Sequence, residues 1–193
     1  IKDPHEIDLM KKACRISEES HVEAMKFVKP GMTEQEMEAF YLYEFAKRGG
    51  RFSAYTPIVA GGENACVLHY VENSKPLLDG DLLLVDAGCE YNFYASDITR
   101  TFPVSGKFTD AQLAIYEVVL EAESKAIAAV SVNNNVMDAQ IISEKVVTQG
   151  LIDLGILTGS LDDLHAKGAF KEFYMHKIGH WLGIDVHDAG DYM

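Results

Sequence analysis

The sequence lacks any apolar run that approaches the roughly 20 residues of a membrane-spanning helix, and it is poor in basic residues. Its 17 lysines and arginines face 30 aspartates and glutamates, which gives a formal net charge of −13. A surface this acidic repels phosphate groups, so we expect neither nucleic acid nor a membrane as a partner. The three cysteines, Cys14, Cys66 and Cys89, are odd in number and form no CxxC motif. A reducing, cytoplasmic compartment is the expectation.

Apolar and charged residues are present in the balance of a globular protein. The 193 residues are 48% hydrophobic and 24% charged, which excludes disorder, and the length fits one domain or a domain plus a fragment. The chain begins at Ile1 rather than Met and stops at Met193, after a segment rich in histidine and glycine. We therefore expect it to be a piece of a longer protein.

Capping patterns predict the helices. At three places a residue that can cap a helix stands three positions before Glu or Gln, and an apolar face follows. The pairs are Asp3 with Glu6, where Pro4 follows Asp3, Thr33 with Glu36, and Thr109 with Gln112. Asn133–Asn135 predicts a turn before a further helix. The predicted helices run from Asp3 to about Phe27, from Thr33 to before Gly49, from Thr109 to about Val130 and from Asp138 through Leu154.

Between these helices the hydrophobic period changes to that of short strands. The predicted strands cover 57–60, 66–69, 82–86 and 97–104, and strand-like runs recur at 173–175 and 176–187. Helices that precede and follow a strand group predict an α+β fold, in which helices cover one face of a mostly antiparallel, curved sheet.

Two acids follow the most apolar strand. Asp86 ends the run 82–85, and Asp97 comes 11 residues later at the start of the next predicted strand. A hairpin would bring the two carboxylates side by side, where they repel unless one is protonated or a cation lies between them. Two acids that only cap turns are an equally open interpretation at this point.

Histidines favour the metal interpretation. His176, His180 and His187 lie within 12 residues among apolar and glycine residues, and His69 lies in the predicted strand 66–69. The glutamate of an HExxH zinc helix is absent between His176 and His180. Histidine beside aspartate is nevertheless a common ligand set for transition metals. The remaining histidines are assigned structural places, His21 in the core and His5 and His165 on the surface.

Linked motifs resemble the aminopeptidase P (Xaa-Pro aminopeptidase) family. They come in that family's order and spacing, and the similarity spans nearly the whole chain. The segments are Ile1–Ile7, Leu68–Asn73 (LHYVEN), Val85–Tyr91 (VDAGCEY), Asp97–Thr109 (DITRTFPVSGKFT) and Gly179–Asp188 (GHWLGIDVHD). The resemblance implies the pita-bread (creatinase/aminopeptidase) fold. Residues 1–193 would form its catalytic domain, incomplete at the C-terminal end and without the family's N-terminal domain.

The resemblance also implies roles for individual residues. Asp86, Asp97 and His180 would bind a pair of divalent ions, with manganese (Mn²⁺) as the expected metal and Asp97 as the bridging ligand. The histidines that would contact substrate or the developing oxyanion are His69, His176 and His187. Substrates would be peptides with proline at the second position. The full-length protein would be a homo-oligomer.

Two alternatives stay open. A prolidase that cleaves Xaa-Pro dipeptides shares the fold, and so do peptide-binding modules without catalytic activity. The family supplies two further glutamate ligands downstream, so we expect residues 1–193 alone to be inactive.

Overall fold

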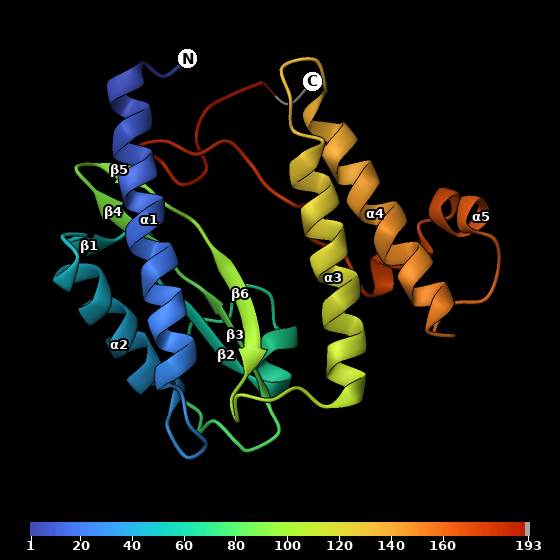
Figure 1. Cartoon of the computed structure of the whole chain (residues 1–193), viewed down its shortest axis with the longest axis horizontal. Coiled ribbons are helices and arrows are strands. Elements are labelled where there is room, and N and C mark those ends of the chain that lie inside the picture. The colour runs from blue at the N-terminus through green and yellow to red at the C-terminus, as the bar shows by residue number, and fades with distance from the viewer. Residues whose placement is uncertain (192–193) are drawn as a thin grey trace. The chain divides into compact units, whose positions relative to one another are not determined.

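The computed structural model describes residues 1–191, which divide into two compact units (Figure 1). The first unit contains residues 1–108 and 181–189. The second contains residues 109–180 and 190–191. No helix in the described part of the chain has the length and apolar character needed to cross a membrane.

Two helices of the first unit confirm the capping predictions. They are α1 (Pro4–Phe27) and α2 (Glu34–Lys47). The Asp3 carboxylate accepts a hydrogen bond from the Glu6 amide, and the Glu6 carboxylate accepts one from the Asp3 amide. Thr33 and Glu36 make the same reciprocal pair at α2. Each pair satisfies backbone donors that would otherwise lack partners at a helix start.

Six strands of the first unit form two three-stranded antiparallel sheets, which confirms the α+β expectation. One sheet has the order β1 (Phe52–Ser53), β4 (Cys89–Tyr91), β5 (Tyr94–Ala95). The other has the order β2 (Ile58–Gly61), β3 (Leu82–Asp86), β6 (Thr99–Pro103). The predicted strands at 57–60, 82–86 and 97–104 are therefore present, the last one shorter than predicted.

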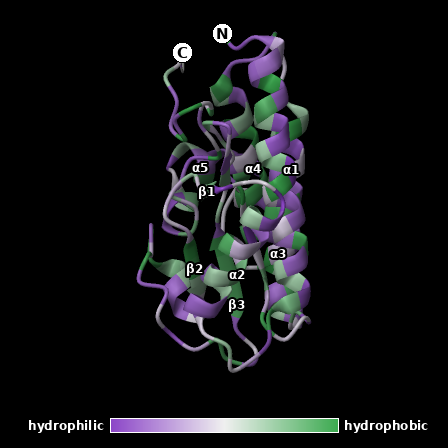
Figure 2. Ribbon diagram, turned by 90° about the vertical axis from the view of Figure 1, so that its left-hand side faces the viewer, coloured by the Kyte–Doolittle hydropathy of each residue, from purple (hydrophilic) through white to green (hydrophobic). Residues whose placement is uncertain are grey.

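The core of the first unit lies between the helices and the strands. Helix α1 packs against β4 and β5, and α2 packs against β1 and β2. Strands β2 and β3 are green in Figure 2, whereas the helices carry bands of both colours because only one side of each is buried. The fully buried side chains include Ile16, Met37, Tyr41, Phe45, Val59, Leu77, Leu83 and Val85.

The second unit is helical. It contains α3 (Asp110–Ala128), α4 (Val136–Asp153), α5 (Leu161–Ala166) and a 3₁₀ helix at Ala169–Glu172. Helices α3 and α4 lie side by side (Figure 1). A Cβ added at Gly150 of α4 would lie 2.4 Å from a methyl carbon of Val118 on α3, so the two helices approach closely there. The predicted helices are confirmed, the second of them starting two residues earlier than expected.

Three strand predictions are wrong, those at 66–69, 173–175 and 176–187. Residues 66–69 form no strand, because Gly62–Cys66 is a 3₁₀ helix and His69 has φ +54°, outside the extended region. Residues 173–187 pair with no neighbouring strand in the described chain. Several of their hydrogen bonds are local instead, as in the Tyr174 amide donating to the Phe170 carbonyl. Phe173 and Met175 are about half exposed, so the burial that stabilises a strand is absent.

Candidate metal centre

Hairpin register brings Asp86 and Asp97 together. Strand β3 pairs with β6 so that Asp86 faces Thr99, and β4 pairs with β5 in the same register. Between the two ladders the Ala87 amide donates to the Ile98 carbonyl. Continuing this register places Gly88 opposite Asp97, so both carboxylates belong to one face of the hairpin. The predicted hairpin is thus present, with Asp97 two residues before β6 rather than at its start.

Gly88 makes a close approach of the two strands possible. A Cβ built on Gly88 would lie 1.8 Å from the carbonyl oxygen of Ser96 and 3.0 Å from the amide nitrogen of Asp97. Any other residue would collide with backbone, which cannot rotate away. Gly88 therefore lets the chain after Asp86 run against the chain before Asp97.

Tyr55 links the two carboxylates. Its hydroxyl lies 2.5 Å from Asp86 Oδ1 and 3.1 Å from Asp97 Oδ1. Burial, and then the negative charge of the two aspartates, raises the pKa of Tyr55 above its ordinary value, so the hydroxyl stays protonated and donates. One hydroxyl thus lies within hydrogen-bond distance of both acids.

A bulge gives Tyr55 this position. Ser53 faces Cys89 and Ile58 faces Asp86. The chain therefore advances five residues from Ser53 to Ile58 where the facing chain spans only three, from Asp86 to Cys89. The two extra residues push the chain around Tyr55 out of regular pairing. No motif in the sequence points to Tyr55, which lies outside every predicted helix and strand.

Helix α1 supports the backbone between the two acids through His21. The Ala87 carbonyl can only accept, so His21 Nε2 carries the proton and donates to it over 3.2 Å. Nδ1 then accepts from the Tyr41 hydroxyl at 2.9 Å. Burial lowers the pKa of His21 to about 4, so the ring is neutral at pH 7. The core assignment of His21 is confirmed.

The donor set at Asp86 and Asp97 fits a hard divalent cation. Two half-buried carboxylates converge on one point, and carboxylate oxygen suits magnesium, calcium and manganese. Within each unit, the described residues gather no group of three or more His, Cys, Asp and Glu side chains that could hold a metal. The two aspartates are therefore the candidate ligands whose geometry the structure gives.

His187 belongs to the same unit as the aspartates. Its segment, 181–189, is anchored by the Ala95 amide, which donates to the Gly183 carbonyl at 2.8 Å. Lys2 Nζ also lies 2.7 Å from Asp188 Oδ2, and this ammonium holds the pKa of Asp188 below its ordinary value. Lys2, just before α1, and Ala95 of β5 thus hold the chain beside His187.

His69, the other predicted histidine of this unit, is exposed on the loop 62–75. Its left-handed φ of +54° is uncommon for a residue with a side chain. The structure therefore places His69 on a shaped loop instead of the predicted strand.

His176 and His180 belong to the second unit. His176 is exposed, and its Nδ1 lies 2.7 Å from the Lys177 carbonyl oxygen. His180 is half-buried. The three histidines of the 176–187 cluster are thus divided between the two units.

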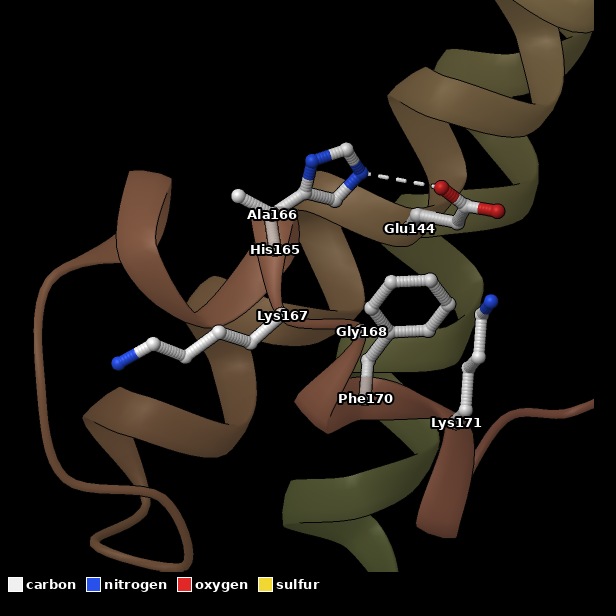
Figure 3. Close-up of a pocket in the computed structure, with 7 residues that line it drawn as sticks. All are labelled: Glu144, His165, Ala166, Lys167, Gly168, Phe170 and Lys171. Carbon is white, nitrogen blue, oxygen red and sulfur yellow. Dashed lines mark hydrogen bonds and ion pairs between the residues drawn. The ribbon is translucent and has the colours of Figure 1, made fainter.

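The second unit also contains a pocket of about 190 Å³ (Figure 3). His165 Nε2 lies 3.0 Å from Glu144 Oε2, and the His165 ring stacks on Phe170, so its surface assignment is wrong. No predicted site residue lines this pocket, whose lining is Glu144, His165, Ala166, Lys167, Gly168, Phe170 and Lys171.

Comparison with known proteins identifies the family. Residues 8–193 match the model of metallopeptidase family M24. The chain belongs to that family. It is 52% identical over 192 residues to the Xaa-Pro aminopeptidase of Haemophilus influenzae, covering 100% of this chain and 45% of that relative. The resemblance seen in the motifs is thereby confirmed.

Solved structures of family M24 share the fold. Pseudomonas aeruginosa aminopeptidase PepP superposes with a TM-score of 0.97 at 48% identity, over 100% of this chain and 43% of that one. Zn-substituted Escherichia coli aminopeptidase P, solved in complex with product, gives a TM-score of 0.97 at 45% identity, over 99% and 43%. The pita-bread expectation is confirmed. The chain spans less than half the length of these relatives.

Proposed function

We propose that the full-length protein is a metal-dependent aminopeptidase that hydrolyses the bond between an N-terminal residue and a following proline. The observation that carries the proposal is the convergence of Asp86 and Asp97 on the Tyr55 hydroxyl, in a chain that matches metallopeptidase family M24 over residues 8–193. The 52% identity to an Xaa-Pro aminopeptidase supports the substrate class.

The proposed ligands are Asp86, Asp97 and His180, with Mn²⁺ as the resident ion. Two carboxylates and one imidazole form a mainly hard donor set, which suits manganese better than a thiolate site would. Divalent ions at this site would polarise the scissile carbonyl and lower the pKa of the attacking water. Tyr55 would orient the two carboxylates by donating to both of them.

The proposed role of His69, His176 and His187 is to contact substrate and to donate hydrogen bonds to the oxygen of the carbonyl under attack. An imidazole N–H aimed at that oxygen stabilises charge that develops only in the transition state. The resemblance also supports two further proposals, a homo-oligomeric full-length protein and a cytoplasmic location.

The test uses purified full-length protein and three peptides: Xaa-Pro-Yaa, the dipeptide Xaa-Pro, and Xaa-Ala-Yaa. We expect release of Xaa from the first peptide alone, loss of activity after chelation, and recovery with added Mn²⁺. Preference for the dipeptide would indicate a prolidase. Binding of the peptides without cleavage would indicate a peptide-binding module, and either result would overturn the proposal.

A further inference from the structure

Glu34, the first residue of α2, is a fully buried acid with four donors around its carboxylate. Oε1 accepts hydrogen bonds from the Gly61 amide and the Asn64 side chain, both at 2.9 Å. Oε2 accepts from the Tyr70 hydroxyl at 2.8 Å and from the Lys75 amide at 2.9 Å. Every strong acceptor position of this carboxylate is thus used inside the protein.

These contacts keep the acid ionised. Burial by itself would raise the pKa of Glu34, but the four hydrogen bonds together hold the pKa below its ordinary value. A buried carboxylate without such donors would be strongly destabilising. The arrangement of the donors is therefore a required part of the fold around α2.

The same carboxylate joins the two ends of one loop. Its Oε1 partners lie at the start of the loop 62–75, and its Oε2 partners lie in the second half of the loop and at its end. Beyond the 3₁₀ helix Gly62–Cys66, the loop has no helix or strand of its own in the structure. Its shape therefore depends on side chains that reach across it.

Asn73 fixes the second half of the loop to the strand region. Its side-chain oxygen accepts from the Val59 amide at 2.9 Å, and its amide nitrogen donates to the Pro57 carbonyl at 2.9 Å. Asn73 is 2% exposed and has φ +44°. Tyr70 and Asn73 thus hold the buried side of the loop, and His69 stands on its exposed side.

We propose that Glu34 and Tyr70 are positioning residues that hold His69 in the conformation it uses at the active site. His69 immediately precedes Tyr70, so fixing the Tyr70 ring and hydroxyl also fixes the backbone that carries the imidazole. The contacts of Glu34 with both ends of the loop hold the left-handed φ of His69. This inference rests on the proposed function.

The test is a double-mutant cycle in the full-length protein. Tyr70→Phe removes only the hydroxyl, and we expect kcat on Xaa-Pro-Yaa to fall about 10-fold, as a small misplacement of an active-site group can cause. In a His69→Ala background the same change is expected to have no further effect. Tyr43→Phe, at an exposed position of α2, is the matched control and should leave kcat unchanged in both backgrounds.

Hydrogen exchange gives a readout that does not depend on activity. Tyr70→Phe is expected to speed amide exchange in residues 62–75, and Tyr43→Phe is not. Glu34→Gln should have a larger effect, because in either orientation its NH2 group faces a backbone amide, that of Gly61 or that of Lys75, which can only donate. Should this variant fail to fold, Tyr70→Phe still decides the question.

Several outcomes would overturn the inference. These are an unchanged kcat in Tyr70→Phe, an equal loss of kcat with and without His69, or unchanged exchange in the loop. A native protein without Xaa-Pro activity would instead refute the proposed function and, with it, the catalytic part of the inference. The exchange data would still decide whether Tyr70 orders the loop.

Discussion

Replacing Gly88 with alanine should disrupt the pair of aspartates without removing a carboxylate. The new Cβ would lie 1.8 Å from the Ser96 carbonyl oxygen and 2.5 Å from the Ser96 carbonyl carbon. Both are backbone atoms of the residue before Asp97, and real Cβ contacts shorter than 3.0 Å are essentially absent from proteins. The two strands would therefore have to separate by roughly 1 Å, a displacement large enough to matter for catalysis.

That separation sets the size of the effect. Metal–ligand distances tolerate changes of about 0.2 Å, so a displacement several times larger should weaken metal binding by at least about 10-fold to 100-fold. We expect turnover to fall on the order of 100-fold or more. Overpacking a tight site should also cost about 1–3 kcal/mol of the free energy of unfolding.

Isothermal titration calorimetry with Mn²⁺ and a tripeptide assay measure these effects in the full-length protein. Gly106→Ala is the control for the steric argument, since an added Cβ there would have nothing within 4 Å; Gly106, unlike Gly88, has a positive φ of +76°. The control should lose some stability through backbone strain and keep its metal affinity. Native metal affinity and turnover in Gly88→Ala would refute the argument that the close approach holds the two acids together.

Three further predictions follow from the same geometry. Tyr55→Phe should weaken Mn²⁺ binding about 10-fold in a calorimetric titration, because both carboxylates lose a donor that orients them; unchanged affinity would contradict this. His187→Ala should lower kcat on the order of 100-fold with near-normal metal content, and loss of metal would instead make His187 a ligand. His21 takes up its proton near pH 4 when folded but near pH 6.5 when unfolded. The free energy of unfolding should therefore fall by about 3 kcal/mol between pH 7 and pH 4. Denaturant titrations at the two pH values should show a smaller fall in His21→Gln than in the native protein.

Local signals in the sequence predicted much of the fold. Each capped helix start depends on residues a few positions apart, such as Asp3 with Glu6, so the pattern is complete within one turn. The convergence of Asp86 and Asp97 was also predictable, because two strands joined by a short connection pair with each other. The short connection between the two strands then determines which residues face each other.

Long-range contacts explain what the sequence did not reveal. The loop that carries His69 is shaped by Glu34, which lies 27 to 41 residues from its four partners, and no local pattern announces such a link. Tyr55 reaches the aspartates only because a two-residue bulge shifts the register between two strand pairs. The apolar alternation at 173–187 suggested strands, but a strand also needs a partner, which periodicity alone cannot supply.

The most direct test of the central claim is the metal content of the full-length protein and its Asp97→Ala variant, measured by mass spectrometry of the purified proteins alongside turnover of Xaa-Pro-Yaa. A carboxylate shared between two ions should be essential to both, so we expect about two ions per native chain. The variant should lose most of its metal and all measurable turnover. Asp79→Ala, at an exposed turn, is the matched control and should match the native protein. Two ions per chain with near-native turnover in Asp97→Ala would contradict the account.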